Sequence, residues 1–151
     1  MSNRKLEISK PQRFFGVIFF ILFVLCIYVA LISALSFTIS KDNIEDVMIT
    51  SDSPDLTIDT TIKVNIEKPF YQKISNINGY IYHSTLFFTI YTQGSIFDSQ
   101  TEAVIKLSDF NLDKLELSSI EKIAFIDTEE SETKTLDSRL LAEKEKVVWE
   151  K

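Results

Sequence analysis

The chain has 151 residues and a net charge of −6, from 16 Lys and Arg against 22 Asp and Glu. This length leaves room for one folded domain, and the acidic balance argues against a nucleic-acid partner, which would need a positive surface. The lone cysteine, Cys26, lies in an apolar stretch, so the remainder of the chain must fold without disulfide bonds.

The first predicted element is a transmembrane helix over residues 14–37, which follows a basic cytoplasmic tail over residues 1–13. Its 24 residues include no charge and no proline, and at ~1.5 Å per residue such a helix exceeds the ~30 Å hydrocarbon core of a bilayer. A signal sequence cleaved near Ser36 remains an alternative. Small side chains in the helix favour packing against another membrane helix; they are Ala30, Ser33 and Ala34.

The charges on either side of this segment predict its orientation. Residues 1–40 carry a net charge of +3, whereas residues 41–151 carry −9. Basic flanks stay on the cytoplasmic side of a membrane. The chain is therefore predicted to be a single-pass protein of the cell membrane, with the lipid bilayer as a partner, a cytoplasmic N-terminus and an extracytoplasmic C-terminal domain.

Residues 38–135 are predicted to form an extracytoplasmic β domain, and their clearest strand covers residues 56–67. Apolar side chains occupy every second position from Leu56 to Ile66, apart from a polar residue at 60, and polar side chains fill the alternate positions. This alternation is typical of an antiparallel sheet with one solvated face. Pro69 ends the strand, because proline cannot donate a hydrogen bond to a neighbouring strand.

Three further strands are predicted between residues 79 and 107. Asn76 to Gly79 supplies a turn before the first of them. Residues 85–92 are apolar or aromatic on both faces, which indicates a strand buried on both sides. Residues 102–107 alternate again, with three side chains facing inward: Ala103, Ile105 and Leu107.

The last third of the chain is less clearly patterned. Residues 112–118 and 121–127 are predicted as two strands, with a short helix as the alternative for the first part, because short apolar runs discriminate poorly between the two. Residues 127–135 are polar and predict a solvated loop. Residues 136–151 contain no glycine or proline and show one apolar helical stripe, which predicts a short C-terminal amphipathic helix.

Together these elements predict a mainly β fold. The expected architecture is an antiparallel β-sandwich or small barrel outside the membrane, preceded by one N-terminal transmembrane helix and followed by the C-terminal helix. An α+β fold is the alternative.

The sequence offers no set of residues suited to catalysis, cofactor binding or metal binding. His83 is the single histidine, and without further ligands at metal spacing it is expected at a strand end or in a turn. The acidic run from Asp127 to Glu132 lacks the alternating ligands and glycine of a calcium loop. We therefore expect no enzyme, no cofactor and no metal.

Aromatic side chains are the best candidates for a contact or ligand surface. The residues singled out are Phe70, Tyr71, Tyr80, Tyr82 and Trp149. They favour a membrane-anchored binding protein of the cell envelope, acting as an accessory or assembly subunit through contacts with a protein partner in or at the membrane. The alternative is an anchored β domain that binds a lipid or another apolar ligand; that function predicts an enclosed apolar cavity, whereas a protein-binding domain predicts a filled core.

Overall fold

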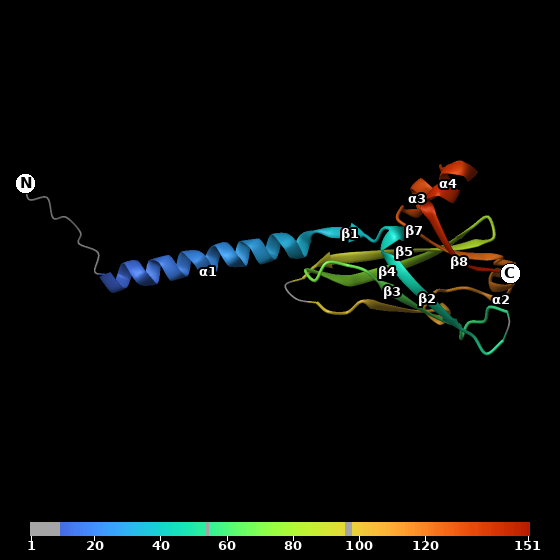
Figure 1. The fold of residues 1–151 in the computed structure, drawn as a ribbon, viewed down its shortest axis with the longest axis horizontal. Helices are drawn as coiled ribbons and strands as arrows, with labels where there is room; N and C mark the ends of the chain where they lie inside the picture. The colour runs from blue at the N-terminus through green and yellow to red at the C-terminus, as the bar shows by residue number, and fades with distance from the viewer. Residues whose placement is uncertain (1–9, 54, 96–97) are drawn as a thin grey trace, which may run out of the picture.

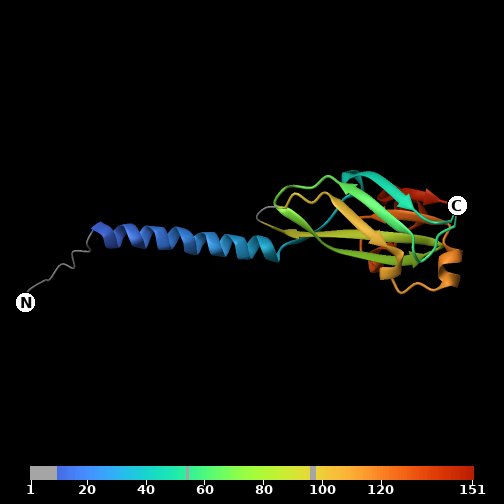
Figure 2. The same cartoon turned by 90° about the horizontal axis from the view of Figure 1, so that it is seen from below.

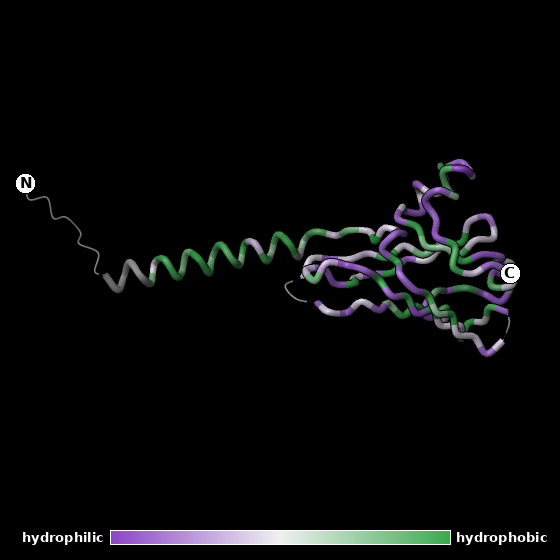
Figure 3. The backbone as a smooth tube through the Cα atoms, in the orientation of Figure 1, coloured by the Kyte–Doolittle hydropathy of each residue, from purple (hydrophilic) through white to green (hydrophobic). Residues whose placement is uncertain are grey.

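A long N-terminal helix projects from one end of a β domain (Figures 1 and 2). The computed structural model describes residues 10–53, 55–95 and 98–151. Helix α1 (Lys10–Ala34) contains an 18-residue window, Phe15–Ile32, that is long and apolar enough to cross a membrane, with none of it buried in the domain. In Figure 3 this stretch is predominantly green, the colour of hydrophobic residues. The helix ends before residue 37, because strand β1 (Ser36–Thr38) already pairs with the domain.

The junction between α1 and the domain is short and tightly packed. Leu35 alone separates the helix from β1, and its carbonyl accepts a hydrogen bond from the Gly94 N–H at 3.2 Å. A Cβ atom on Gly94 would lie 2.0 Å from the carbonyl oxygen of Ile32. Only glycine, which has no side chain, permits this close approach of the two backbones.

The larger sheet is built around β5 (Thr85–Gly94). Strand β4 (Gln72–Tyr82) pairs antiparallel with β5 along its whole length. Strand β1 and strand β7 (Lys122–Ile126) both pair with β5 as well, and β8 (Glu145–Glu150) borders β7. The β5–β7 pairing is parallel, so the prediction of a purely antiparallel fold is wrong; the long connection between these two strands gives the chain room to return in the same direction.

The smaller sheet is antiparallel, with the order β2 (Ile44–Thr50), β3 (Thr61–Ile66) and β6 (Glu102–Lys106). A short 3-10 helix, η1 (Lys41–Asn43), carries the chain to it from β1 in the larger sheet. The alternation predicted for β3 and β6 is confirmed, since the inward side chains of both strands are buried. Strand β3 starts at Thr61 rather than at residue 56, because residues 57–60 form a turn.

The two sheets share one hydrophobic core. Val64 of the smaller sheet and Phe88 and Phe125 of the larger sheet belong to the same buried cluster, and burial of each such phenylalanine contributes ~1.5–3 kcal/mol. The opposite face of β5 is covered too, since Phe87 packs with Ala124 in a second cluster. The prediction that β5 is buried on both faces is confirmed. The result is a mostly β, sandwich-like arrangement of two open sheets, and not a closed barrel.

The turn between β4 and β5 is formed by His83 and Ser84, which have positive φ angles of 47° and 58°. Two successive residues in this left-handed region form the tight turn that matches the twist of a hairpin. The position expected for His83, a strand end or turn, is confirmed. The turn predicted at Asn76–Gly79 is wrong, because these residues pair with β5 inside β4.

The C-terminal third combines short helices with strands. Residues 112–118 fall largely in α2 (Lys114–Ser119), so the helical alternative holds there, while the second predicted strand is confirmed as β7. The loop predicted at 127–135 contains one helical turn, α3 (Glu130–Thr133). The C-terminal helix predicted at residues 136–151 is present only as α4 (Ser138–Lys144), and the prediction is wrong beyond it. Residues 145–150 form a strand because they pair with β7, despite their helix-favouring Glu and Lys.

Candidate functional site

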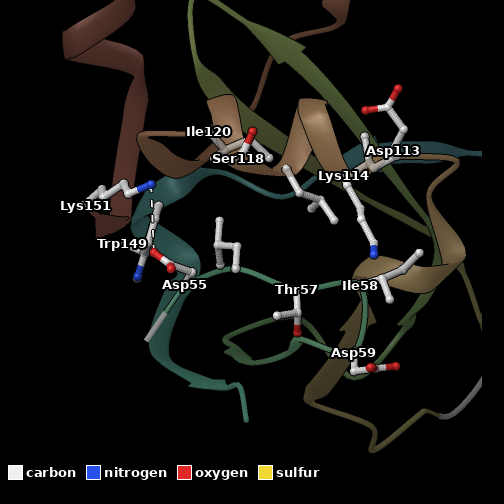
Figure 4. Close-up of a pocket in the computed structure, with 13 residues that line it drawn as sticks. Asp55, Thr57, Ile58, Asp59, Asp113, Lys114, Ser118, Ile120, Trp149 and Lys151 are labelled. Atoms are coloured by element: carbon white, nitrogen blue, oxygen red, sulfur yellow. Dashed lines mark ion pairs between the residues drawn. The ribbon is translucent and has the colours of Figure 1, made fainter. Parts of the chain in front are cut away.

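An open groove of about 610 Å³ lies at the end of the β domain remote from α1 (Figures 1 and 4). Three segments far apart in sequence form it: the β2–β3 connection at residues 55–59, the region of α2 at residues 112–120, and the end of β8 with Lys151. We call this the distal groove. Its size falls in the ~300–1,000 Å³ range of pockets that hold small ligands or a few side chains of a partner.

The floor of the distal groove is the end of the hydrophobic core. Leu117 and Ile120 are buried there, while Leu56, Leu112 and Trp149 are half-buried and pack against the same core. Apolar surface left open in this way is unfavourable in water, at about 25 cal/mol per Å², and is stabilised when a ligand covers it.

One wall of the groove is held in place by threonine hydrogen bonds. The Thr57 N–H donates to Thr60 Oγ1 at 2.9 Å, and the Thr60 N–H donates to the Thr57 carbonyl at 3.0 Å. Thr60 is buried, and its hydroxyl also donates to Ser51 Oγ at 3.2 Å. This turn presents Ile58 with 46% of its surface exposed at the groove (Figure 4).

The opposite wall is α2, which begins with a reciprocal cap. Asp113 Oδ1 accepts a hydrogen bond from the Glu116 N–H at 2.7 Å, and Glu116 Oε2 accepts one from the Asp113 N–H at 2.9 Å. Such a capping box satisfies two backbone donors that the first helical turn leaves free. It fixes the start of a helix that is only six residues long.

Charged side chains surround the apolar floor. Asp55 and Lys151 form an exposed ion pair at 3.9 Å across one end (Figure 4), a geometry that contributes little to stability. Asp59, Asp113 and Lys114 line the remaining rim. An apolar floor with charges of both signs at its rim suits an apolar group that carries polar or charged neighbours, as in a polypeptide segment.

The five aromatic residues predicted as one contact surface lie in three different places. Trp149 lines the distal groove. Phe70 and Tyr71 are exposed at the opposite end of the domain, next to α1, with their rings edge to face at 5.7 Å. Tyr80 and Tyr82 pack on the outer cluster of the larger sheet.

Tyr80 serves a structural role in that outer cluster. Its ring stacks on Phe87 with 5.7 Å between centroids, and its hydroxyl lies 2.6 Å from Thr133 Oγ1. Burial raises the pKa of the Tyr80 hydroxyl, and the nearby Glu130 carboxylate acts in the same direction, whereas the hydrogen bond to Thr133 opposes the rise. The residue therefore stays neutral and attaches α3 to the sheet.

The three small residues predicted for helix packing all belong to α1. Ala30 and Ala34 are exposed on the helix surface, one turn apart, and the side chain of Ser33 lies outside the described residues. Their contact with another membrane helix remains a prediction.

The remaining polar features of the described ranges are dispersed over the domain. Within residues 10–53, 55–95 and 98–151, no three His, Cys, Asp or Glu side chains are placed to hold a metal ion. His83 contacts Tyr82, with 4.1 Å between ring centroids. Glu145 is largely buried, but its Oε1 is paired with Lys122 at 2.8 Å.

Sequence reasoning missed most of the distal groove. The sequence pattern predicts a strand at Leu56 and Ile58 and a strand or short helix at Leu112, with no role in binding. The capping signature Asp113-x-x-Glu116 was present in the sequence and locates the start of α2. Nothing in the sequence indicates that these segments meet beside Trp149.

Comparison of the chain with protein-family models, with curated proteins and with solved structures gives no match.

Proposed function

We propose that the chain is a single-pass, membrane-anchored binding protein of the cell envelope, whose extracytoplasmic domain holds a protein partner in the distal groove. The observation that carries this proposal is the open apolar floor with a charged rim, located at the end of the domain farthest from α1. The basic N-terminal flank and the acidic domain support an orientation with the domain outside the cytoplasm.

The filling of the core supports a protein partner over a lipid enclosed between the sheets. Phe88 and Phe125, which a ligand cavity would have to displace, are fully buried and contact each other at 5.8 Å between centroids. An anchored domain also raises its local concentration near other membrane proteins, so a modest groove is sufficient for transient binding. Such binding is typical of an accessory or assembly subunit.

A small apolar ligand in the same groove is the second candidate. The observation in its favour is the apolar lining of the groove, which brings Trp149 together with Leu56, Leu112 and Leu117. Native mass spectrometry of the purified full-length chain distinguishes the two, because a retained small molecule adds a discrete mass whereas a transient protein partner dissociates during purification.

Photo-crosslinking in native membranes tests the proposal. A benzophenone side chain replaces Ile58 in the groove, and in the matched control it replaces Val104 on β6, which is exposed to a similar extent, 44% against 46%. We expect a protein adduct from position 58 only. No adduct at position 58, or the same adducts at both positions, would show that the distal groove is not the binding site.

A further inference from the structure

We propose that the end of the domain next to α1 is seated in the interfacial layer of the bilayer, so that lipid contacts both the helix and the domain. The residues concerned are Leu35, Phe37, Phe70 and Tyr71, which we call the proximal collar. The inference rests on the membrane anchor of the proposed function and goes beyond it, because it assigns a second interaction surface and names its partner as a lipid surface.

The length of the apolar helix places the proximal collar at the membrane boundary. The 21 residues from Phe14, the first after Arg13, to Ala34 rise ~31 Å at ~1.5 Å per residue, which matches the ~30 Å hydrocarbon core. The hydrocarbon therefore ends at the last turn of α1. Leu35, which is 52% exposed, and Phe37 follow immediately.

A loop of the domain reaches the same level. The connection between β3 and β4 lies at the end of the domain where α1 joins it, in both Figure 1 and Figure 2. Phe70 and Tyr71 at its tip face the last turns of α1 across an apolar cavity of about 420 Å³, which Tyr28, Val29 and Ile32 line on the helix side. Phe70 is 67% exposed and Tyr71 is 46% exposed. Tyrosine is enriched at membrane–water interfaces, and an exposed phenylalanine supplies apolar surface that lipid can cover.

The loop that carries this aromatic pair is held by a buried charge. The side chain of Lys68 is 1% exposed, and its ammonium donates to the Gln72 carbonyl and to both the carbonyl and Oδ1 of Asp98, the latter at 3.2 Å. We call Lys68, Gln72 and Asp98 the polar clamp. Because the clamp occupies the inner side of the loop, Phe70 and Tyr71 are held outward on an ordered turn, where their apolar surface remains uncovered by the domain.

Continuity with the membrane helix identifies lipid as the occupant of this surface. The cavity between the aromatic pair and α1 is lined on one side by residues of the apolar window itself, so hydrocarbon that surrounds the helix also reaches the collar. The exposed Tyr71 supplies an apolar ring with a polar hydroxyl, the combination that suits the headgroup boundary. With α1 and the loop both in contact with lipid, the long axis of the domain is held away from the membrane plane. The distal groove then faces away from the membrane.

Depth-dependent fluorescence quenching in reconstituted vesicles tests this inference. The full-length chain carries Trp149→Phe and one new tryptophan: Phe70→Trp in the collar, Leu22→Trp within the span, or Leu115→Trp, an exposed site on α2 at the far end (79%). Vesicles of phosphatidylcholine and phosphatidylglycerol contain phosphatidylcholine brominated near the top of its acyl chains, and acrylamide is the aqueous quencher.

We expect brominated lipid to quench the tryptophans at positions 22 and 70 but not at 115, and acrylamide to quench position 70 several-fold less than position 115. Acrylamide quenching at 70 equal to that at 115, with no lipid quenching, would overturn the inference while position 22 still demonstrates insertion. Protection at 70 from both quenchers would indicate a covering protein chain and would also overturn it.

The same measurement separates this inference from the anchor. If brominated lipid does not quench the tryptophan at position 22 either, α1 does not cross the membrane. The proposed function is then wrong as well. Tyr71→Trp in the same background repeats the test at a neighbouring exposed site, so a local disturbance from one substitution does not decide the result.

Discussion

The two ends of the β domain both expose apolar side chains, but their supporting structures differ. At the end next to α1, Phe70 and Tyr71 stand on a loop held by the buried ammonium of Lys68, and the backbone of α1 touches that of β5 at Gly94. At the distal end, the groove is open between a threonine turn and a helix of six residues. The first end therefore holds its exposed residues in a fixed position, whereas the second leaves its apolar floor open to solvent.

The largest effect is expected from Gly94→Ala at the junction. The new methyl group would meet the Ile32 carbonyl, and backbone cannot move aside as a flexible side chain can, so we expect a loss of about 3 kcal/mol in the free energy of unfolding. Chemical unfolding of the full-length chain in detergent measures it. Gly16→Ala is the control, since nothing lies within 4 Å of its Cβ position; equal stability of the two variants would show that the junction is loose.

Removal of the polar clamp comes next. In Lys68→Met the apolar stem is kept, but the Gln72 and Asp98 oxygens lose their shared donor, and we expect a loss of about 2 kcal/mol. Lys73→Met, which removes an exposed ammonium close by on β4, should leave stability nearly unchanged. A Lys68→Met variant as stable as the wild type would contradict the role of the clamp.

At the distal end we expect a smaller loss in the free energy of unfolding. Asp113→Ala removes Oδ1, the side-chain acceptor of the capping box, while the backbone N–H of residue 113 can still donate to Glu116 Oε2; the loss should be about 1 kcal/mol in the free energy of unfolding. Photo-crosslinking from Ile58 should weaken because α2 forms the opposite wall. The control is Arg139→Ala, which breaks an exposed ion pair on α4 that contributes little and does not line the groove. Unchanged crosslinking in Asp113→Ala would indicate that α2 does not shape the binding site.

The smallest effect is a pH dependence at the end next to α1. The hydrogen bond from the Gln100 N–H, together with Lys68, holds the pKa of Asp98 below its ordinary value of 3.8. The Asp98 carboxylate binds a proton less tightly in the folded chain than in the unfolded chain. Its contribution to the free energy of unfolding is therefore complete above the ordinary pKa and is lost as the pH falls through the lowered pKa. Between neutral pH and about pH 3, the melting temperature should fall more steeply for the wild type than for Asp98→Asn. The same fall in both proteins would exclude the effect.

The parts of the fold that follow from local pattern were predictable. Strand β5 is apolar on both faces and is buried on both faces, and the inward positions of β3 and β6 follow their alternation. The N-terminal helix, long and apolar enough to cross a membrane, is evident from length and composition.

Other parts depend on contacts that no local pattern reveals. Strand β8 mixes helix-favouring Glu and Lys with strand-favouring Val147, Val148 and Trp149, and pairing with the edge of β7 decides for the strand. The Asn76–Gly79 turn was misplaced because β5 pairs through that region, and the turn fell instead on His83 and Ser84, which rarely adopt positive φ. The distal groove combines three distant segments, so only Trp149 of its lining was singled out beforehand.

The single residue between α1 and β1 has a consequence for the choice of partners. A flexible linker between an anchor and a domain allows the domain to occupy many positions around the attachment point. Here the Ile39 N–H donates to the Ile90 carbonyl at 2.9 Å just beyond β1, which ties the chain into the sheet as soon as it leaves the helix. Under the proposed function, this rigid connection restricts the domain to partners whose docking segment lies at one height above the lipid.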